Sequence, residues 1–335
     1  MALTDERIRV IAAVPGNVND SKMLFVKDQI RSLVRHGVNV HEFYLSSRTN
    51  ILVIAKESYR LYKEIGRFRP HIIHAHFGTL TSFLCAVISL ICGVPLMITF
   101  HGSDLNDVSN VEGHLRNMVQ KIMSNLAALR ASRIICVSER LLHRLWWRRG
   151  GALVIPNGVD ADLFYPLDWN DARAQLGWDL SGHVILFCQS NFSRLKRVDI
   201  ALSTLDRLKS HVQTARLQIL NDVEHNVVPL YLSAADCLLV CSDSEGSPTI
   251  VKEAMACNLP IVSTDVGDVA ERIRGLYQCS IVEREPNALA RALADTIEAG
   301  ERSNGRTRIM EEGLTDSVVA AKILSVYRDL IQQNG

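Results

Sequence analysis

The chain has 335 residues, of which 47% are hydrophobic and 22% charged, a composition typical of a soluble globular protein with a substantial core. This length favours two domains over one. The eight cysteines include no Cys-x-x-Cys pair and lie mostly among apolar neighbours, which argues against disulfides and zinc and favours reduced thiols in the cytosol. The amino-terminal MALTDERIRV is charged and lacks the apolar core of a signal peptide.

Charge is unevenly distributed, although the formal net charge is only +1. Residues 1–165 carry 20 Lys and Arg against 13 Asp and Glu, which leaves 17 against 23 for residues 166–335. This asymmetry predicts an anionic partner for the first half, such as a membrane surface, although chance scatter explains the same numbers.

Short apolar segments alternate with amphipathic ones along the whole chain. The apolar segments predict strands and the amphipathic ones predict helices, such as those at 24–35 and 198–208, so the alternation indicates parallel sheets with helical crossovers. Because ten strands are too many for one compact sheet of ordinary size, we expect two such domains. The predicted strands cover residues 8–13, 38–44, 72–75, 96–100, 134–137, 153–155, 184–188, 217–220, 237–241 and 261–263.

Two segments raise the question of a membrane. FGTLTSFLCAVISLICGVPLMITF, residues 77–100, has no charge over 24 residues and could span a bilayer, but Gly93 and Pro95 divide it into a predicted buried helix and a buried strand. SERLLHRLWWRRGG, residues 138–151, predicts a helix with an arginine stripe beside an apolar stripe that includes Trp146. That pattern suits a helix in a membrane interface, and equally a surface helix with its apolar side packed inward.

The link between the domains is predicted within IPNGVDADLFYPLDW, residues 155–169, which holds a turn dipeptide and two prolines. We therefore expect domains at residues 1–165 and 166–335. A last helix at 316–333 can pack on either domain, including back on the amino-terminal one.

The stretch with the most chemistry is SDSEGSPTIVKEAMACNLPIVSTDVGD, residues 242–268. Ser247 is a suitable N-cap, and Pro248 a suitable first residue, for a helix that starts at the carboxyl end of a predicted strand. Such a helix start offers free N–H groups and a positive dipole end to an anion. Glu245 and Glu253 place carboxylates on both sides of it, which suits a nucleotide sugar with hydroxyls on both sides of its diphosphate. Alternatively, Glu245 only stabilises the helix start and Glu253 is a solvated helix residue.

The same stretch resembles the Glu-x7-Glu motif of the family-4 retaining glycosyltransferases. Five further segments resemble successive blocks of that family in the same order: HIIHAHFG, ITFHGSD, ICVSE, VIPNGVDADLFYP and LYLSAADCLLVCSDSEG. The resemblance covers nearly the whole chain and implies an α/β protein of the GT-B fold. Two Rossmann-like domains with parallel sheets would face each other across a central cleft, the first binding the acceptor and the second the nucleotide-sugar donor.

The resemblance also implies roles for individual residues. Three would be catalytic, with His101 against the transferred sugar, Glu245 on its hydroxyls and Lys196 on the diphosphate. Asp104 and His76 would lie on the acceptor side. The donor would contact the backbone and side chains of Arg194, Gly246, Ser247, Pro248, Thr249, Ile250, Glu253 and Gly16, with Glu253 on the ribose hydroxyls.

The chain departs from the family pattern at three places. The usual Gly-Arg pair is replaced by Ser190-Asn191, so Arg194 or Arg197 would supply the second cation that stabilises the leaving diphosphate. The amino-terminal loop VPGNVNDSKMLF lacks the usual double glycine. Residues 220–229 form a short segment without the helix and strand that often help to hold the base, which leaves the base open.

A metal site is the main alternative for the histidines. His74 and His76 lie on one face of a predicted strand and, with His101 and Asp104, leave a zinc or manganese site open. The family resemblance instead implies a metal-independent enzyme without a cofactor.

The expected function is a cytoplasmic retaining glycosyltransferase that moves a hexose-type sugar from a UDP- or GDP-linked donor to a hydroxyl of a glycan or lipid-linked acceptor. Polysaccharide or glycolipid biosynthesis is the expected setting, as in bacterial surface-polysaccharide assembly, with a peripheral contact to an anionic membrane at the inner face of the plasma membrane. Nucleic acid is not an expected partner. Two alternatives stay open: a sugar-nucleotide epimerase on the same fold, and a non-catalytic glycosyltransferase-like subunit.

Overall fold

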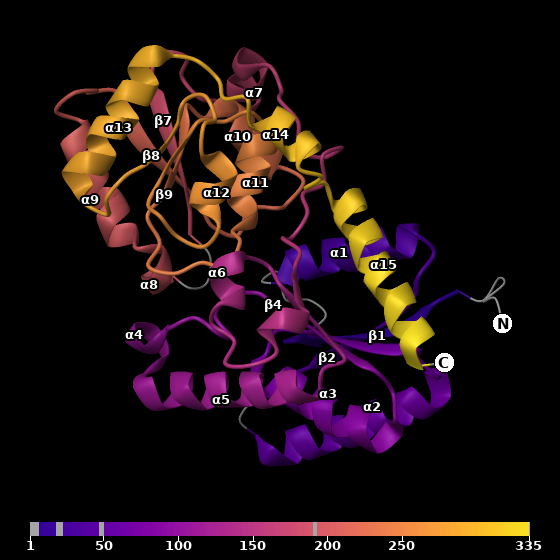
Figure 1. The fold of residues 1–335 in the computed structure, drawn as a ribbon. Coiled ribbons are helices and arrows are strands. Elements are labelled where there is room, and N and C mark those ends of the chain that lie inside the picture. The colour runs from indigo at the N-terminus through magenta and orange to yellow at the C-terminus, as the bar shows by residue number, and fades with distance from the viewer. Residues whose placement is uncertain (1–6, 18–22, 47–49, 190–192, 335) are drawn as a thin grey trace. The chain divides into compact units, whose positions relative to one another are not determined.

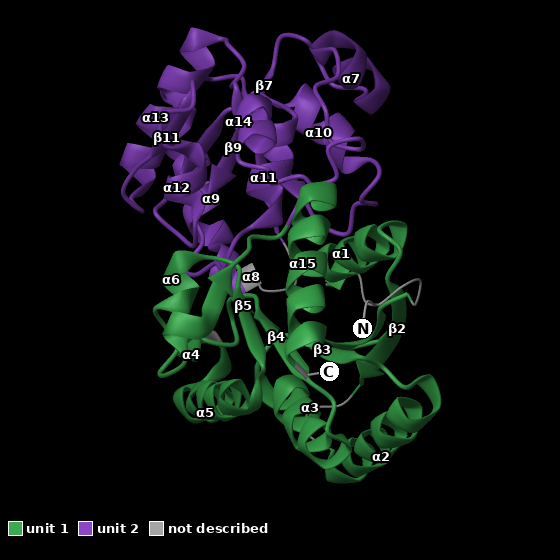
Figure 2. Cartoon of the chain, turned by 45° about the vertical axis from the view of Figure 1, so that its right-hand side comes forward, with its two compact units in different colours: residues 1–157, 316–335 green, residues 158–315 purple. Residues whose placement is uncertain are grey.

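The computed structural model describes residues 7–17, 23–46, 50–189 and 193–334, which form two compact units (Figure 1, Figure 2). Unit 1 contains residues 1–157 and 316–335, and unit 2 contains residues 158–315. The predicted boundary at 165/166 therefore lies inside unit 2. The last helix, α15 (Asp316–Asn334), belongs to unit 1.

Unit 1 is built on a six-stranded sheet with the order β2-β1-β3-β4-β5-β6, in which every pairing is parallel. Its strands are β1 (Arg9–Pro15), β2 (Asn39–Leu45), β3 (Ile72–His76), β4 (Leu96–Phe100), β5 (Arg133–Cys136) and β6 (Ala152–Val154). Its helices, besides α15, are α1 (Leu24–Arg35), α2 (Ile51–Phe68), α3 (Thr79–Cys92), α4 (Ser109–Glu112), α5 (His114–Arg130), α6 (Glu139–Leu142) and the 3-10 helix η2 (Arg149–Gly151).

Each face of this sheet has its own core, because successive residues of a strand point to opposite faces. Ile11 and Ile73 belong to the core that includes residues of α2, α3 and α5. Val10 and Ile72 belong to the core that includes Leu33 of α1 and several residues of α15. The end of the chain therefore completes a core whose strands come from its beginning.

Unit 2 is built on a five-stranded parallel sheet with the order β11-β10-β9-β7-β8. Its strands are β7 (His183–Cys188), β8 (Ala215–Leu220), β9 (Cys237–Val240), β10 (Ile261–Ser263) and β11 (Cys279–Ile281). Its helices are α7 (Trp169–Leu176), α8 (Ser193–Lys196), α9 (Val198–Leu208), α10 (Val228–Ala234), α11 (Thr249–Ala256), α12 (Val269–Ile273), α13 (Pro286–Ala299) and α14 (Gly305–Glu311). Residues of α10, α11 and α14 share one core with the sheet, and residues of α9 and α13 share the other.

The two parallel sheets confirm the predicted α/β class. All ten predicted strands are present, with ends that differ by at most two residues from the prediction. The prediction missed β11, which is three residues long and only partly buried or exposed, so it carries little hydrophobic pattern.

The predicted helix at residues 138–151 is wrong. Only α6 forms there, and turns separate it from η2. Leu145 is buried, Trp147 donates its indole N–H to the backbone carbonyl of Asn125 in α5, and Arg148 has a left-handed φ of 61°. These contacts with α5 outweigh the helical spacing, because a left-handed residue ends a helix.

The uncharged segment at residues 77–100 folds as predicted, into α3 and the buried strand β4. Gly93 ends α3 in the left-handed conformation, as a glycine does after a helix. Within the described ranges, no helix has both the length and the apolar character needed to cross a bilayer.

Candidate active site

The centre of the site in unit 2 is an ion pair at the carboxyl end of β9. Lys196, the last residue of α8, places its Nζ 2.6 Å from Oε1 of Glu245. Both side chains are largely buried. Burial alone would lower the pKa of the Lys196 ammonium, but the Glu245 carboxylate outweighs this effect and raises that pKa. The pair therefore places one cation and one carboxylate at the carboxyl end of β9.

The helix start beside this pair differs from the prediction. Thr249 is the first residue of α11, and Pro248, in an extended conformation, occupies the N-cap position. Ser247 is not the cap, because its hydroxyl donates to Oδ2 of Asp268 at 2.8 Å and accepts from Nζ of Lys252 at 2.7 Å. The start of α11 consequently has no side-chain cap, although the N–H of Val251 donates to the Pro248 carbonyl at 3.3 Å. An uncapped helix start of this kind suits an anion.

A buried network holds the loop that carries Glu245. Lys252 is only 1% exposed, and burial lowers its pKa although the nearby Asp268 opposes this. Asp268 also accepts from Nε of Arg272 at 3.0 Å, and Arg272 in turn donates to Glu312 at 2.7 Å. Lys252, Asp268, Arg272 and Glu312 thus alternate in charge, from the contact with Ser247 to the end of α14.

Gly267 allows the two loops of this site to meet. Its φ is +54°, and a Cβ there would lie 2.7 Å from the carbonyl oxygen of Gly246 and 3.1 Å from Cβ of Glu245. Any other residue would push this backbone away, so the glycine of the STDVGD segment has a steric role at the Glu245 loop.

Glu253, the second glutamate of the motif, points to a different partner. Its Oε1 lies 3.2 Å from Nε2 of His225, and the His225 ring packs against Phe164 with 5.1 Å between centroids. The Glu253 side chain is 12% exposed, so it is not the solvated helix residue of the alternative interpretation. Sequence reasoning missed His225, whose only signal is its place in the shortened segment after β8.

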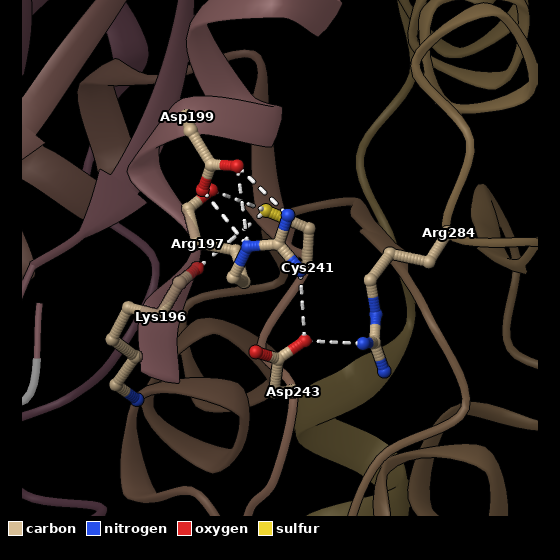
Figure 3. A network of polar contacts seen from close by, with 6 residues as sticks. All are labelled: Lys196, Arg197, Asp199, Cys241, Asp243 and Arg284. Carbon is tan, nitrogen blue, oxygen red and sulfur yellow. Dashed lines mark hydrogen bonds and ion pairs between the residues drawn. The ribbon is translucent and has the colours of Figure 1, made fainter. Parts of the chain in front are cut away.

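The two candidates for the second cation differ in their surroundings. Figure 3 shows Arg197 between Asp199 and Asp243. Nη2 of Arg197 lies 2.8 Å from Asp199 Oδ2, and Nη1 lies 3.1 Å from Asp243 Oδ1. Arg284 contacts the same oxygen of Asp243. The Lys196 side chain extends away from this network (Figure 3).

Arg197 is therefore held by two carboxylates, whereas Arg194 on α8 is exposed. Arg194 fits the role of a second cation better, because its charge is not already shared with Asp199 and Asp243. The Ser190-Asn191 pair lies outside the described residues.

Unit 1 gathers three histidines, two on β3 and one directly after β4. Nδ1 of His76 lies 3.3 Å from Nε2 of His101, and the two rings are stacked with 5.6 Å between centroids. His74 has Tyr327 Oη 2.7 Å from Nδ1 and Thr99 Oγ1 2.7 Å from Nε2. Burial lowers the pKa of all three imidazoles, that of His76 to about 3, so all three are neutral near pH 7.

Asp104 shapes the loop that carries His101. Its carboxylate is fully buried and accepts from the backbone N–H groups of Gly78 at 2.9 Å, Gly102 at 2.8 Å and His101 at 3.1 Å. Burial raises its pKa, and these three N–H donors oppose that effect. In the structure Asp104 therefore binds backbone rather than facing solvent on the acceptor side.

Gly16 lies at the end of β1, where it has a φ of 102° and donates its N–H to the Leu45 carbonyl at 2.9 Å. Residues 18–22 of the loop that lacks the double glycine are outside the described residues. In the part of the chain that the structure describes, no group of three or more His, Cys, Asp and Glu side chains is arranged to hold a metal ion. Both ring nitrogens of His74 already have protein partners.

The predicted site residues thus form two groups, one in each unit. Unit 2 brings together Lys196, Glu245 and the loop from Gly246 to Ile250, with Glu253 further along α11. Unit 1 brings together His76, His101 and Asp104.

Solved structures that align with this chain include glycosyltransferases and UDP-GlcNAc 2-epimerases, and the fold that they share with it is GT-B. Sucrose-phosphate synthase from Thermosynechococcus elongatus aligns with a TM-score of 0.77 at 18% identity, over 98% of this chain and 100% of that one. Alr3699/HepE from Anabaena, in complex with UDP and glucose, aligns with a TM-score of 0.74 at 17% identity, over 96% and 100%. The UDP-GlcNAc 2-epimerase from Methanocaldococcus jannaschii aligns less closely, with a TM-score of 0.61 at 11% identity, over 96% and 99%.

Sequence comparison narrows the class. Residues 2–163 match the model of Glycosyltransferase Family 4, and residues 201–299 match that of Glycosyl transferases group 1. The chain therefore belongs to the family-4 glycosyltransferases. Among curated relatives, TuaC from Bacillus subtilis (strain 168), named as a glycosyltransferase of teichuronic acid biosynthesis, is 30% identical over 251 residues. The match covers 68% of this chain and 60% of TuaC, so the chain spans less than two thirds of that relative.

Proposed function

We propose that the chain transfers a hexose-type sugar, with retention of anomeric configuration, from a nucleoside diphosphate to an acceptor hydroxyl. The observation that carries this proposal is the Lys196–Glu245 pair, with 2.6 Å between Nζ and Oε1, beside the uncapped start of α11. A cation, a carboxylate and free N–H groups at one place suit a ligand that has a diphosphate next to sugar hydroxyls.

The donor would reorganise this pair when it binds. Its diphosphate would take the Lys196 ammonium and the N–H groups of α11, which releases the Glu245 oxygens to accept hydrogen bonds from the sugar hydroxyls. Glu253, now held by His225, would take the ribose hydroxyls. The complex of HepE with UDP and glucose supports a UDP-linked donor, and a GDP-linked one remains the alternative.

The transfer step needs no carboxylate nucleophile and no metal. The acceptor oxygen would attack the anomeric carbon from the side of the leaving group while the bond from that carbon to the phosphate oxygen breaks. The departing phosphate oxygen takes the proton of the acceptor hydroxyl. Lys196 stabilises the charge that gathers on the diphosphate, and the neutral His101 would contact the transferred sugar, as the family resemblance implies.

We propose a glycan or lipid-linked acceptor in polysaccharide or glycolipid biosynthesis, on the cytoplasmic side of a membrane. The name of TuaC, which refers to teichuronic acid biosynthesis, supports this setting. The basic first half of the chain supports an anionic surface as the place where the acceptor is met.

Release of nucleoside diphosphate tests the proposal. The purified chain is incubated with UDP- and GDP-linked hexoses, with and without a lipid extract as acceptor, and release is expected only when donor and acceptor are both present. Lys196→Met should lower turnover about 10²–10³-fold, because it removes charge stabilisation of the leaving group. Lys209→Met, at an exposed lysine at the end of α9, is the matched control and should leave turnover unchanged.

Three outcomes would contradict transfer by this site. Wild-type turnover in Lys196→Met would remove the lysine from the mechanism. Conversion of the donor sugar to its epimer without release of nucleoside diphosphate would favour the epimerase. Donor binding without release under any acceptor condition would favour the non-catalytic subunit.

A further inference from the structure

An apolar stripe faces solvent along α5 of unit 1. Large apolar residues recur at positions 115, 118, 119, 122, 126 and 129, and their exposed fractions lie between 36% and 71%. By helix pitch these positions fall within an arc of about 100° and extend over about 21 Å. A helix that packed only on its own unit would bury such a stripe, so this one indicates an interaction surface.

The stripe continues on both sides of α5. On one side α3 packs against α5 (Figure 1, Figure 2). Its residues Val87, Leu90 and Ile91 are also exposed. On the other side, Trp146 donates its backbone N–H to Oδ1 of Asn125 in α5 and leaves its side chain half exposed. Together these residues form what we call the α3–α5 face.

Three arginines, Arg130, Arg148 and Arg149, lie at or near the carboxyl end of α5, whereas Arg116 and Lys121 lie in its first half. Arg130 and Arg148 donate to the backbone carbonyls of Ser89 and Leu129, and Arg149 donates to that of Leu145. In the described part of the chain, no carboxylate pairs with any of these three arginines. α3 has no charged residue and α5 has no acidic one. By contrast, Arg116 and Lys121 of α5 have carboxylate partners. Arg116 lies 3.4 Å from Glu112, and Lys121 lies 3.6 Å from Asp107.

We propose that the α3–α5 face docks on an anionic lipid surface, with the apolar stripe in the interface and the three arginines on the headgroups. Apolar side chains beside uncompensated arginines and an exposed tryptophan are the features that bind helices to such interfaces. The face includes Trp146, Arg148 and Arg149 of the segment 138–151, for which the sequence alone suggested membrane contact, but most of its apolar surface lies on α5 and α3.

Vesicle co-sedimentation of the full chain tests this docking without donor or acceptor, so its outcome is independent of the proposed transfer reaction. Wild type is expected to bind vesicles of phosphatidylcholine with phosphatidylglycerol, to bind phosphatidylcholine alone much less, and to lose binding at high salt. The double variant Ile122→Gln/Leu126→Gln should bind at least about tenfold less, because two apolar side chains no longer partition. Arg148→Gln/Arg149→Gln should lose about fivefold per arginine.

Leu202→Gln in α9 is the matched control, since Leu202 is 47% exposed and Leu126 is 43% exposed. It should bind as wild type does. If the α5 double variant fails to fold, as judged by its thermal unfolding, Leu115→Gln/Met118→Gln at the other end of the stripe replaces it. The proposal is overturned by equal binding of the folded variants and wild type, by equal binding to neutral vesicles, or by no vesicle binding. A wild-type dimer that the same variants dissociate would also overturn it, in favour of a second copy.

Discussion

The histidines of unit 1 show how burial decides what a side chain can do. His74, His76 and His101 all have a pKa below the usual value of 6.5, because burial disfavours the charged imidazolium, and for His74 and His101 the neighbouring histidines add to it. Neutral rings can stack and share hydrogen bonds, as those of His76 and His101 do. In the transfer reaction proposed above, His101 would therefore contact the donor sugar as a neutral ring near pH 7.

This burial predicts a specific pH dependence of stability. Below pH 6.5 the unfolded chain binds protons at these histidines, whereas folded His76 binds one only near pH 3. The stability that these neutral histidines contribute is therefore fully present above pH 6.5. It falls on acidification, by up to about 1.4 kcal/mol per pH unit for each histidine. Urea unfolding between pH 7 and 4.5 measures how the free energy of unfolding falls with pH. In His76→Gln this fall should be smaller than in wild type by about 1.4 kcal/mol per pH unit. His211→Gln, at an exposed histidine, should keep the wild-type slope, and an equal slope in both variants would contradict the prediction.

At the same scale, the site was predictable where residue type fixes the chemistry. Lys196 and Glu245, 49 positions apart in the chain, were both assigned to the donor site, and the structure brings them into contact. The partner of Glu253 was not predictable, since nothing in the spacing of His225 indicates that its ring packs on Phe164. Ser247 was predicted as a cap from its type alone, but the buried Lys252 and Asp268 compete for its hydroxyl.

Among the secondary-structure elements, hydrophobic patterns were reliable where burial is local and failed where tertiary contacts compete. The central strands were found because both of their faces are buried. The segment at 138–151 has helical spacing, yet Trp147 and Arg148 bind backbone carbonyls of α5 instead of continuing α6. Only the position of α5, which spacing within the segment does not encode, decides between these outcomes.

The loop before α11 yields a prediction at this scale. Gly267→Ala should place a methyl group against the Gly246 carbonyl, 2.7 Å away before relaxation, and displace Glu245. Gly275→Ala is the matched control, since Gly275 also has a positive φ, +73°, but nothing lies within 4 Å of its added Cβ. Both variants should lose about 1 kcal/mol of stability from backbone strain, and Gly267→Ala should lose more.

Donor binding separates the two variants more sharply than stability does. Thermal shift with a nucleotide sugar should be reduced in Gly267→Ala and retained in Gly275→Ala, because only Gly267 contacts the Glu245 loop. Equal donor binding in both variants would show that the close approach of the two loops does not position the site.

At the scale of the whole molecule, the order of the segments along the chain does not match their division into the two units. α15 follows unit 2 in sequence but completes a core of unit 1, where Val319, Ile323 and Tyr327 pack with Val10 and Ile72. The last helix was predicted as an element, but its place was left open, because an amphipathic helix at a chain end can cover any apolar face of matching size. Its place is specified by particular contacts, and the clearest is the buried hydroxyl of Tyr327 against His74.

Tyr327→Phe tests how strongly that contact fixes the helix. The variant keeps the ring, which packs on His74 with 5.7 Å between centroids, but leaves Nδ1 of His74 buried without its partner at 2.7 Å. An unsatisfied buried group costs about 1–3 kcal/mol, which corresponds to a fall in Tm of about 2–4 °C per kcal/mol for a unit of this size. Tyr277→Phe in unit 2 is the control, because Tyr277 is 54% exposed and its hydroxyl contacts the side chains of Glu301 and Gln278 near the surface. Its effect should stay within about 0.5 kcal/mol. A loss in Tyr327→Phe no larger than that in Tyr277→Phe would mean that apolar packing alone holds α15 in unit 1.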